Sequence, residues 1–280
     1  MDYFANGRKM NTRKTVWMKL LRKAKYLIFI PRKVTRRPAD PGSLVSDLFP
    51  IMAGDNWSTE FELLDLPSLI RGSYDKTTDH EAEFYFFDKN GNLLGKQLIN
   101  AGSTSRFTLD ITALISDTFS GAATFAVFHK DVSIPNEMGT SLAAERGYTG
   151  YRLEQLPAKG YVHGNLDSIA LTSDGLQNIG NKGVLNRYYN LQHLLRGEAE
   201  YIFALTNPTS KKVKIKIELK SGKQRYRILD EFSVPPRGIR FFTHSVRETE
   251  TAQLRILSKL YLARPVVIRV TKHSMDIFHG

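Results

Sequence analysis

After residue 43 the chain alternates short apolar runs with turn-forming residues, a pattern that predicts β-strands. One apolar run covers Phe84 to Phe87, and another covers Leu93 to Ile99, with Asn90-Gly91 between them. An Asn-Gly pair supplies the positive φ angles that a tight type I′ turn requires. We therefore expect a β-hairpin here, closed by a type I′ turn.

A second hairpin is expected between residues 212 and 228. Its first strand alternates apolar residues with lysines, and its second alternates them with arginines. A turn at Ser221-Gly222 would place Glu218 opposite Arg225 and give the hairpin one charged face and one apolar face. The basic face could attract polyanions, although lysines on a strand more often form a solvated face or protect a sheet edge.

The two hairpins correspond to each other at a shift of 131 residues. This shift superposes glycine on glycine and apolar residue on apolar residue: Gly91 on Gly222, Phe84 on Ile215, Phe86 on Ile217 and Phe125 on Ile256. The correspondence predicts a duplicated antiparallel module, with chance similarity between two β-rich stretches as the alternative. The expected fold is mainly β, with two β-sandwich modules that resemble immunoglobulin-like or jelly-roll sandwiches. No specific motif connects the chain to one family.

The N-terminal segment has a different character from the rest of the chain. Residues 1–37 contain twelve Lys and Arg residues and one acidic residue, so they carry +11 of the net charge of +12. Between Trp17 and Ile30, apolar residues recur at three- and four-residue steps with basic residues opposite them, which predicts a short amphipathic helix. The expected organisation is therefore a basic segment (1–37), module 1 (38–130), a connector (131–184) and module 2 (185–280).

Three roles are open for the basic segment. It could lie on an anionic membrane surface, through Trp17, Lys19, Arg22, Lys23 and Lys25. It could bind nucleic acid as a basic arm, a less favoured reading because apolar residues are interleaved with the charges. It could also dock its apolar side on the body of the protein.

The same composition bears on localisation. The apolar run of the segment is too short to span a bilayer, and neither a signal-peptide core nor a cleavage site is evident. The chain has no Cys, which suits a reducing compartment. We expect a cytoplasmic protein, attached peripherally at the inner face of the membrane if the segment binds lipid.

The connector holds the candidate binding site. Tyrosine, arginine, histidine and acidic residues gather there beside glycines, and glycines allow a ligand to approach the backbone closely. Tyrosine rings suit the apolar face of a sugar, and arginine suits carboxylates or phosphates. The candidate ligand-binding residues are Glu145, Arg146, Tyr148, Tyr151, Arg152, His163, Asn165 and Asp167. The alternative is purely structural, with Arg146 paired to Glu145 or Glu154 and the tyrosines packed between modules.

No catalytic motif, cofactor motif or metal-ligand spacing is recognisable. An acid–base pair could be drawn from Glu145, His163 and Asp167, but nothing in their spacing requires one. The seven histidines are dispersed, so neither a metal nor a cofactor is expected.

The sequence therefore favours a non-catalytic binding protein for a carbohydrate or other anionic ligand, held at an anionic surface by its basic N-terminus. Two alternatives stay open. One is a glycan-acting enzyme that uses the region of Glu145, His163 and Asp167. The other is a structural or capsid-like protein whose basic arm binds nucleic acid.

Overall fold

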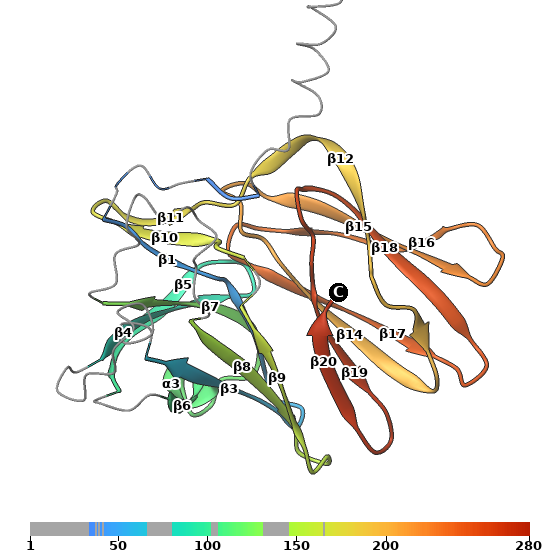
Figure 1. The fold of residues 1–280 in the computed structure, drawn as a ribbon, viewed down its shortest axis with the longest axis horizontal. Coiled ribbons are helices and arrows are strands. Elements are labelled where there is room, and N and C mark those ends of the chain that lie inside the picture. The colour runs from blue at the N-terminus through green and yellow to red at the C-terminus, as the bar shows by residue number, and fades with distance from the viewer. Residues whose placement is uncertain are drawn as a thin grey trace, which may run out of the picture. The chain divides into compact units, whose positions relative to one another are not determined.

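The computed structural model describes residues 34–36, 38, 40, 42–65, 80–101, 106–130, 146–164 and 166–280. Val34–Gly280 forms a compact unit (Figure 1). The predicted N-terminal helix, with Trp17, Lys19, Arg22, Lys23 and Lys25, lies outside the described residues, as do Glu145 and Asn165. Within the described part, no helix is long and apolar enough to cross a membrane.

The described residues form five small antiparallel sheets and one five-residue helix, α3 (Ile111–Ile115). The cap sheet has the order β1 (Leu44–Ser46), β10 (Ile169–Thr172), β11 (Gly175–Asn178). Sheet I has the order β2 (Phe49–Ala53), β7 (Gly121–His129), β4 (Glu81–Asp88), β5 (Leu93–Asn100). Sheet II has the order β6 (Arg106–Asp110), β3 (Trp57–Leu64), β8 (Gly147–Leu153), β9 (Lys159–His163).

The remaining strands form two further sheets. Sheet III has the order β17 (Ile239–Val246), β14 (Ala199–Thr206), β19 (Val266–Val270), β20 (Met275–His279). Sheet IV has the order β12 (Lys182–Asn190), β18 (Thr251–Leu260), β15 (Val213–Ser221), β16 (Arg227–Val234), and β13 (Leu195–Arg196) also pairs with β18.

Each sheet packs against the next through an apolar cluster. Phe128 lies between the cap sheet and sheet I, and Phe125 between sheets I and II. Tyr151 lies between sheets II and III, and Phe203 between sheets III and IV. The five sheets are therefore arranged like the blades of a five-bladed propeller (Figure 1). The prediction of two immunoglobulin-like or jelly-roll sandwiches is wrong in this respect, because sheets II and III also share a core and a fifth sheet covers sheet I.

The strand order of sheets I and II is repeated in sheets III and IV. β2-β7-β4-β5 corresponds to β12-β18-β15-β16, and β6-β3-β8-β9 corresponds to β17-β14-β19-β20. The shift of 131 residues also holds in the register, because Phe86 pairs with Phe125 where Ile217 pairs with Ile256. A register irregularity follows Phe86 on β4 and Ile217 on β15. Among the described residues, the cap sheet has no counterpart on sheet IV.

The first predicted hairpin exists, but its turn is not of type I′. Only Gly91, with φ of 81°, has a positive φ in this turn, and its amide donates to the carbonyl of Asp88 at 2.9 Å. That geometry matches a three-residue loop whose last residue is left-handed. A two-residue turn with positive φ at both positions occurs at Asp55 and Asn56, with φ of 51° and 68°, between β2 and β3.

The second predicted hairpin also exists, but with a different register. Glu218 pairs with Ile228, and Arg225 does not belong to the ladder. The chain turns between Ser221 and Gln224, whose amide donates to the Ser221 carbonyl at 3.0 Å, and β16 begins only at Arg227. The prediction that Glu218 faces Arg225 is therefore wrong.

The predicted connector contributes strands to both neighbouring structures. β8 and β9 complete sheet II, because β8 pairs with β3 and β9 pairs with β8. β10 and β11 form most of the cap sheet. A boundary at residue 130 therefore cuts through sheet II, whereas the other predicted boundaries remain predictions.

Candidate functional site

The outer face of sheet II collects charged and aromatic side chains. Side chains alternate between the two faces of a strand, so β3 turns Phe61 and Leu63 into the core and Glu60 and Glu62 outward. Registry with β6, β8 and β9 brings polar neighbours to the same outer face. We call this surface the sheet II face: Glu60, Glu62, Arg106, Tyr148, Arg152, Lys159, Tyr161 and His163.

Gly150 forms the flat centre of this face. A Cβ atom at Gly150 would lie 2.6 Å from the ring of Tyr161 and 2.8 Å from Cγ of Glu60. Only glycine lets the Tyr161 ring lie this close to the strand. The local sequence Tyr148-Thr149-Gly150-Tyr151-Arg152 thus gives a platform with an aromatic ring above its backbone.

Ion pairs hold the two glutamates of the face in place. Lys159 Nζ lies 2.6 Å from Glu60 Oε2, and the hydroxyl of Tyr161 donates to Glu60 Oε1. Arg106 pairs with Glu62. Burial alone would raise the pKa of Glu60, but the hydrogen bonds from Lys159 and Tyr161 outweigh it and lower the pKa. Burial, together with the hydrogen bond to Glu60, raises the pKa of Tyr161.

Three of the sequence-predicted residues lie on this face: Tyr148, Arg152 and His163. Tyr148 is opposite both Glu62 and His163 in the ladder, and Arg152 is opposite Lys159. Sequence reasoning did not include the other five residues of the face among the candidates. The alternation of Glu60 and Glu62 with Phe61 and Leu63 was the signal that could have found the two glutamates.

Arg146 and Asp167 are brought together, but inside the protein. Arg146 is 4% exposed, and its guanidinium contacts Asp167 Oδ1 at 2.8 Å, Asp47 Oδ2 at 3.2 Å and the Val45 carbonyl at 2.5 Å. Burial raises the pKa of Asp47 even though Arg146 opposes that shift. This buried cluster joins β1, β8 and the segment between β9 and β10. Arg146 is thus paired with residues other than the predicted Glu145 or Glu154.

Tyr151 is also structural in its placement. It is 1% exposed, and its hydroxyl donates to the Pro50 carbonyl at 2.9 Å. Its ring packs in the cluster between sheets II and III. The prediction that Tyr151 contacts a surface ligand is therefore corrected: β8 turns this side chain to the face opposite Tyr148.

The proposed acid–base set does not assemble among the described residues. Asp167 is engaged by Arg146, and His163 Nδ1 donates to the carbonyl of Gly164 at 2.5 Å. Glu145 lies outside the described residues. Within the described ranges, no group of three or more acidic or histidine residues has the geometry of a metal site.

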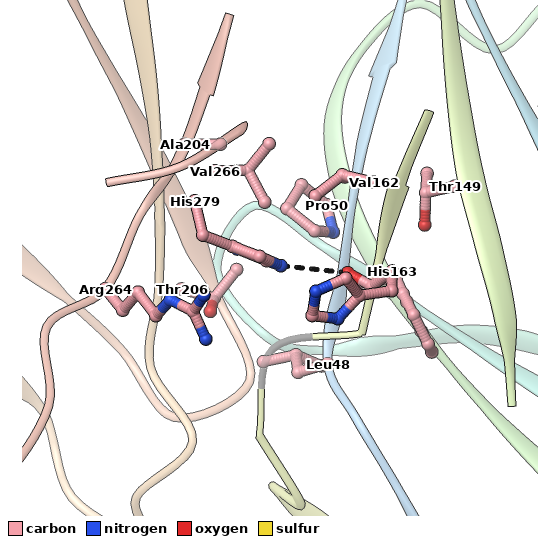
Figure 2. Close-up of a pocket in the computed structure, with 11 residues that line it drawn as sticks. Leu48, Pro50, Thr149, Val162, His163, Ala204, Thr206, Arg264, Val266 and His279 are labelled. Carbon is pink, nitrogen blue, oxygen red and sulfur yellow. Dashed lines mark hydrogen bonds between the residues drawn. The ribbon is translucent and has the colours of Figure 1, made fainter. Parts of the chain in front are cut away.

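A small pocket lies next to His163, between sheets II and III. Its polar lining consists of Thr149, His163, Thr206, Arg264 and His279 (Figure 2). The ring of His279 extends across the pocket toward His163, and its Nε2 donates to the His163 carbonyl at 3.1 Å. The two imidazole rings meet edge to face with centroids 4.8 Å apart.

Comparisons with known proteins do not assign a family. No family model matches the chain, and no curated protein matches it. Two solved structures are similar over 88% of this chain at 11% identity and a TM-score of 0.16. They are a beta-glucuronidase from glycoside hydrolase family 2 and a glycosyl hydrolase family 2 member from Bacteroides cellulosilyticus DSM 14838. The chain spans 24% and 30% of their lengths, and a TM-score this low supports no conclusion about fold or function.

Proposed function

We propose that this chain is a non-catalytic carbohydrate-binding protein and that the sheet II face is its binding surface. The observation that carries the proposal is the ring of Tyr161 lying over Gly150, beside two outward-facing glutamates. Sugar rings have apolar faces that pack on aromatic rings and hydroxyl groups that hydrogen-bond to carboxylates. The sheet II face offers both kinds of contact within one strand spacing.

The charges of the face favour a sugar that carries an anionic group. Arg106, Arg152 and Lys159 are exposed on it, whereas Glu62 is buried. Charge-assisted hydrogen bonds to a carboxylate or sulfate group are stronger than neutral ones, and arginine is well suited to planar anions. The ligand class proposed is therefore an acidic glycan.

The face is also fixed before any ligand binds. Four paired strands support it, and the pairs Glu60–Lys159 and Glu62–Arg106 tie neighbouring strands across it. Less conformational freedom is lost on binding when contact groups are already ordered. This rigidity suits a recognition surface.

The alternative of a glycan-acting enzyme has less support. Of its proposed residues, Asp167 is engaged by a buried arginine and His163 donates to a neighbouring carbonyl. An enzyme would have to draw its acid and base from other groups. Glu60 and Glu62 are outward-facing carboxylates, but each has a cationic partner.

Replacement of Tyr161 tests the binding surface. Tyr161→Ala removes the ring above Gly150, so affinity for an acidic glycan should fall about tenfold, roughly 1.4 kcal/mol. Tyr188→Ala is the matched control, because Tyr188 is also a strand tyrosine and is 54% exposed on sheet IV, compared with 38% for Tyr161. Calorimetric titration of both variants gives the comparison. Unchanged affinity in Tyr161→Ala, or an equal loss in Tyr188→Ala, would contradict the proposal.

Peripheral attachment through the N-terminal segment remains a prediction, as does a cytoplasmic location. The full chain should co-sediment with vesicles that contain phosphatidylserine, and the variant with Lys19, Arg22 and Lys23 changed to Glu should not. Each basic residue near an anionic surface contributes about 1 kcal/mol. Equal sedimentation of both proteins would remove this idea, and salt-sensitive binding of the unmodified chain to nucleic acid would favour the basic-arm alternative.

A further inference from the structure

The pocket between sheets II and III has a lining of one electrical sign. Among its lining residues, all of which are described, none is acidic, and the charged or titratable members are His163, Arg264 and His279. Thr149 and Thr206 add hydroxyl groups. A water-sized pocket with a guanidinium, two imidazoles and two hydroxyls presents donors to an anion without a competing carboxylate.

The nearest carboxylate behind this pocket is committed elsewhere. Asp47 lies against Gly164, where a Cβ atom would be 1.9 Å from Asp47 Oδ2. Its charge is paired with Arg146 at 3.2 Å, away from the pocket lining. Asp47 therefore does not neutralise the lining residues.

His279 leaves one ring nitrogen without a partner. The residue is 9% exposed, its Nε2 donates to the His163 carbonyl, and its Nδ1 is buried with no hydrogen bond among the described atoms. A buried polar atom without a partner is uncommon and requires an explanation. In the neutral ring this Nδ1 is an acceptor, and protonation would turn it into a second N–H donor.

The size of the pocket limits what it can hold. It has room for about one water-sized particle. Sulfate, phosphate or a sugar would not fit without displacement of the lining side chains. Chloride is of suitable size and charge.

We infer that this pocket binds one small monovalent anion of chloride size and that binding is coupled to uptake of a proton by His279. The inference is independent of glycan binding, because it uses a different cavity and a different class of ligand. Arg264 supplies the permanent charge, and His279 supplies the charge that depends on pH.

The charged surroundings of His279 determine the direction of this coupling. Burial, then Arg264 and then His163 lower the pKa of His279 to about 4. Of the other titratable groups nearby, Tyr189 donates its hydroxyl to the Gly280 carbonyl, and Asp47 lies behind Gly164. An anion in the pocket opposes the effect of Arg264 and so raises the pKa of His279. By linkage, anion affinity must then increase as pH falls.

The test is an NMR titration of the histidine ring protons of the full chain, in chloride and in gluconate at equal ionic strength. Gluconate is monovalent but too large for the pocket. The His279 resonance, assigned by its loss in His279→Gln, should titrate at least about one pH unit higher in chloride. The resonances of His80 and His129, which are hydrogen-bonded to each other at 2.8 Å elsewhere, serve as internal controls and should not respond.

Two variants and one further salt distinguish this pocket from general surface binding. Arg264→Met should abolish the chloride-dependent shift of His279, and Thr206→Val, which keeps the side-chain volume, should reduce it. Sulfate should behave as gluconate does, because the basic N-terminal segment favours sulfate whereas the pocket excludes it. Equal His279 titrations in chloride and gluconate, a full shift in sulfate, or a shift that persists in both variants would each overturn the inference.

Discussion

Gly91 and Gly222 occupy equivalent positions in the two repeats but carry different constraints. Both have positive φ, 81° and 53° respectively. A Cβ atom at Gly91 would lie 1.8 Å from the carbonyl oxygen of Pro236, whereas nothing lies within 4 Å at Gly222. The turn of sheet I thus rests against the segment before β17, and the carbonyl of Lys89 accepts from the amide of Ile239 at 3.2 Å.

This difference predicts unequal costs for the same substitution. Gly222→Ala should cost about 1–2 kcal/mol of unfolding free energy, which is the penalty for a left-handed conformation. Gly91→Ala should cost that amount plus about 1–3 kcal/mol, because backbone must move to accept the methyl group. Urea unfolding of both variants measures the difference. Equal losses would show that the turn of sheet I does not press on the segment at Pro236.

At the scale of elements, the buried cluster around Arg146 joins segments that are far apart in sequence. Asp47 follows β1, Arg146 precedes β8, and Asp167 lies between β9 and β10. All three side chains are nearly buried, at 4–10% exposure, so each charge depends on the others. Removal of one partner from a buried ion pair leaves an uncompensated charge.

Arg146→Met should therefore cost about 3–5 kcal/mol of unfolding free energy. Arg269→Met is the control, because Arg269 pairs at 2.9 Å with Asp276, whose side chain is 58% exposed. That variant should cost less than about 1 kcal/mol, as surface ion pairs do. Chemical denaturation of both proteins provides the measurement. A loss at Arg146 no larger than that at Arg269 would contradict a stabilising role for the cluster.

The hairpins were predictable from alternation, but their turns depended on side chains that alternation does not describe. Asp88 Oδ1 accepts from the amides of Asn90 and Asn92 at 2.8 and 2.9 Å, which favours the longer loop over a type I′ turn. In the second hairpin, Tyr226 leaves the ladder, and the Arg255 guanidinium lies 3.7 Å from its ring centroid. Both contacts replace the simplest register with another one.

The candidate site was predictable only in part, for reasons of parity. Tyr148 and Tyr151 are three residues apart, so a strand must turn them to opposite faces. Tyr148 and Arg152 share a parity, and both reach the sheet II face. Arg146 could not have been placed from local sequence, because its partner Asp47 lies 99 residues away.

At the scale of the whole described body, the repeat explains most of the fold. Eight strands of sheets I and II correspond in order to eight strands of sheets III and IV. β10 and β11, which have no counterparts, form the cap sheet over sheet I. The sequence indicated the repeat through its shift of 131 residues, but packing between sheets II and III depends on contacts between the two repeats. The sheet II face is one of the surfaces that these five sheets leave exposed.

The central claim is that the sheet II face recognises acidic glycans. The most direct test is to screen the full chain, at physiological salt, on an array of neutral and acidic glycans beside the Tyr161→Ala variant. The account predicts selective binding to acidic glycans that Tyr161→Ala weakens strongly. A blank array, or binding that Tyr161→Ala leaves unchanged, would contradict it.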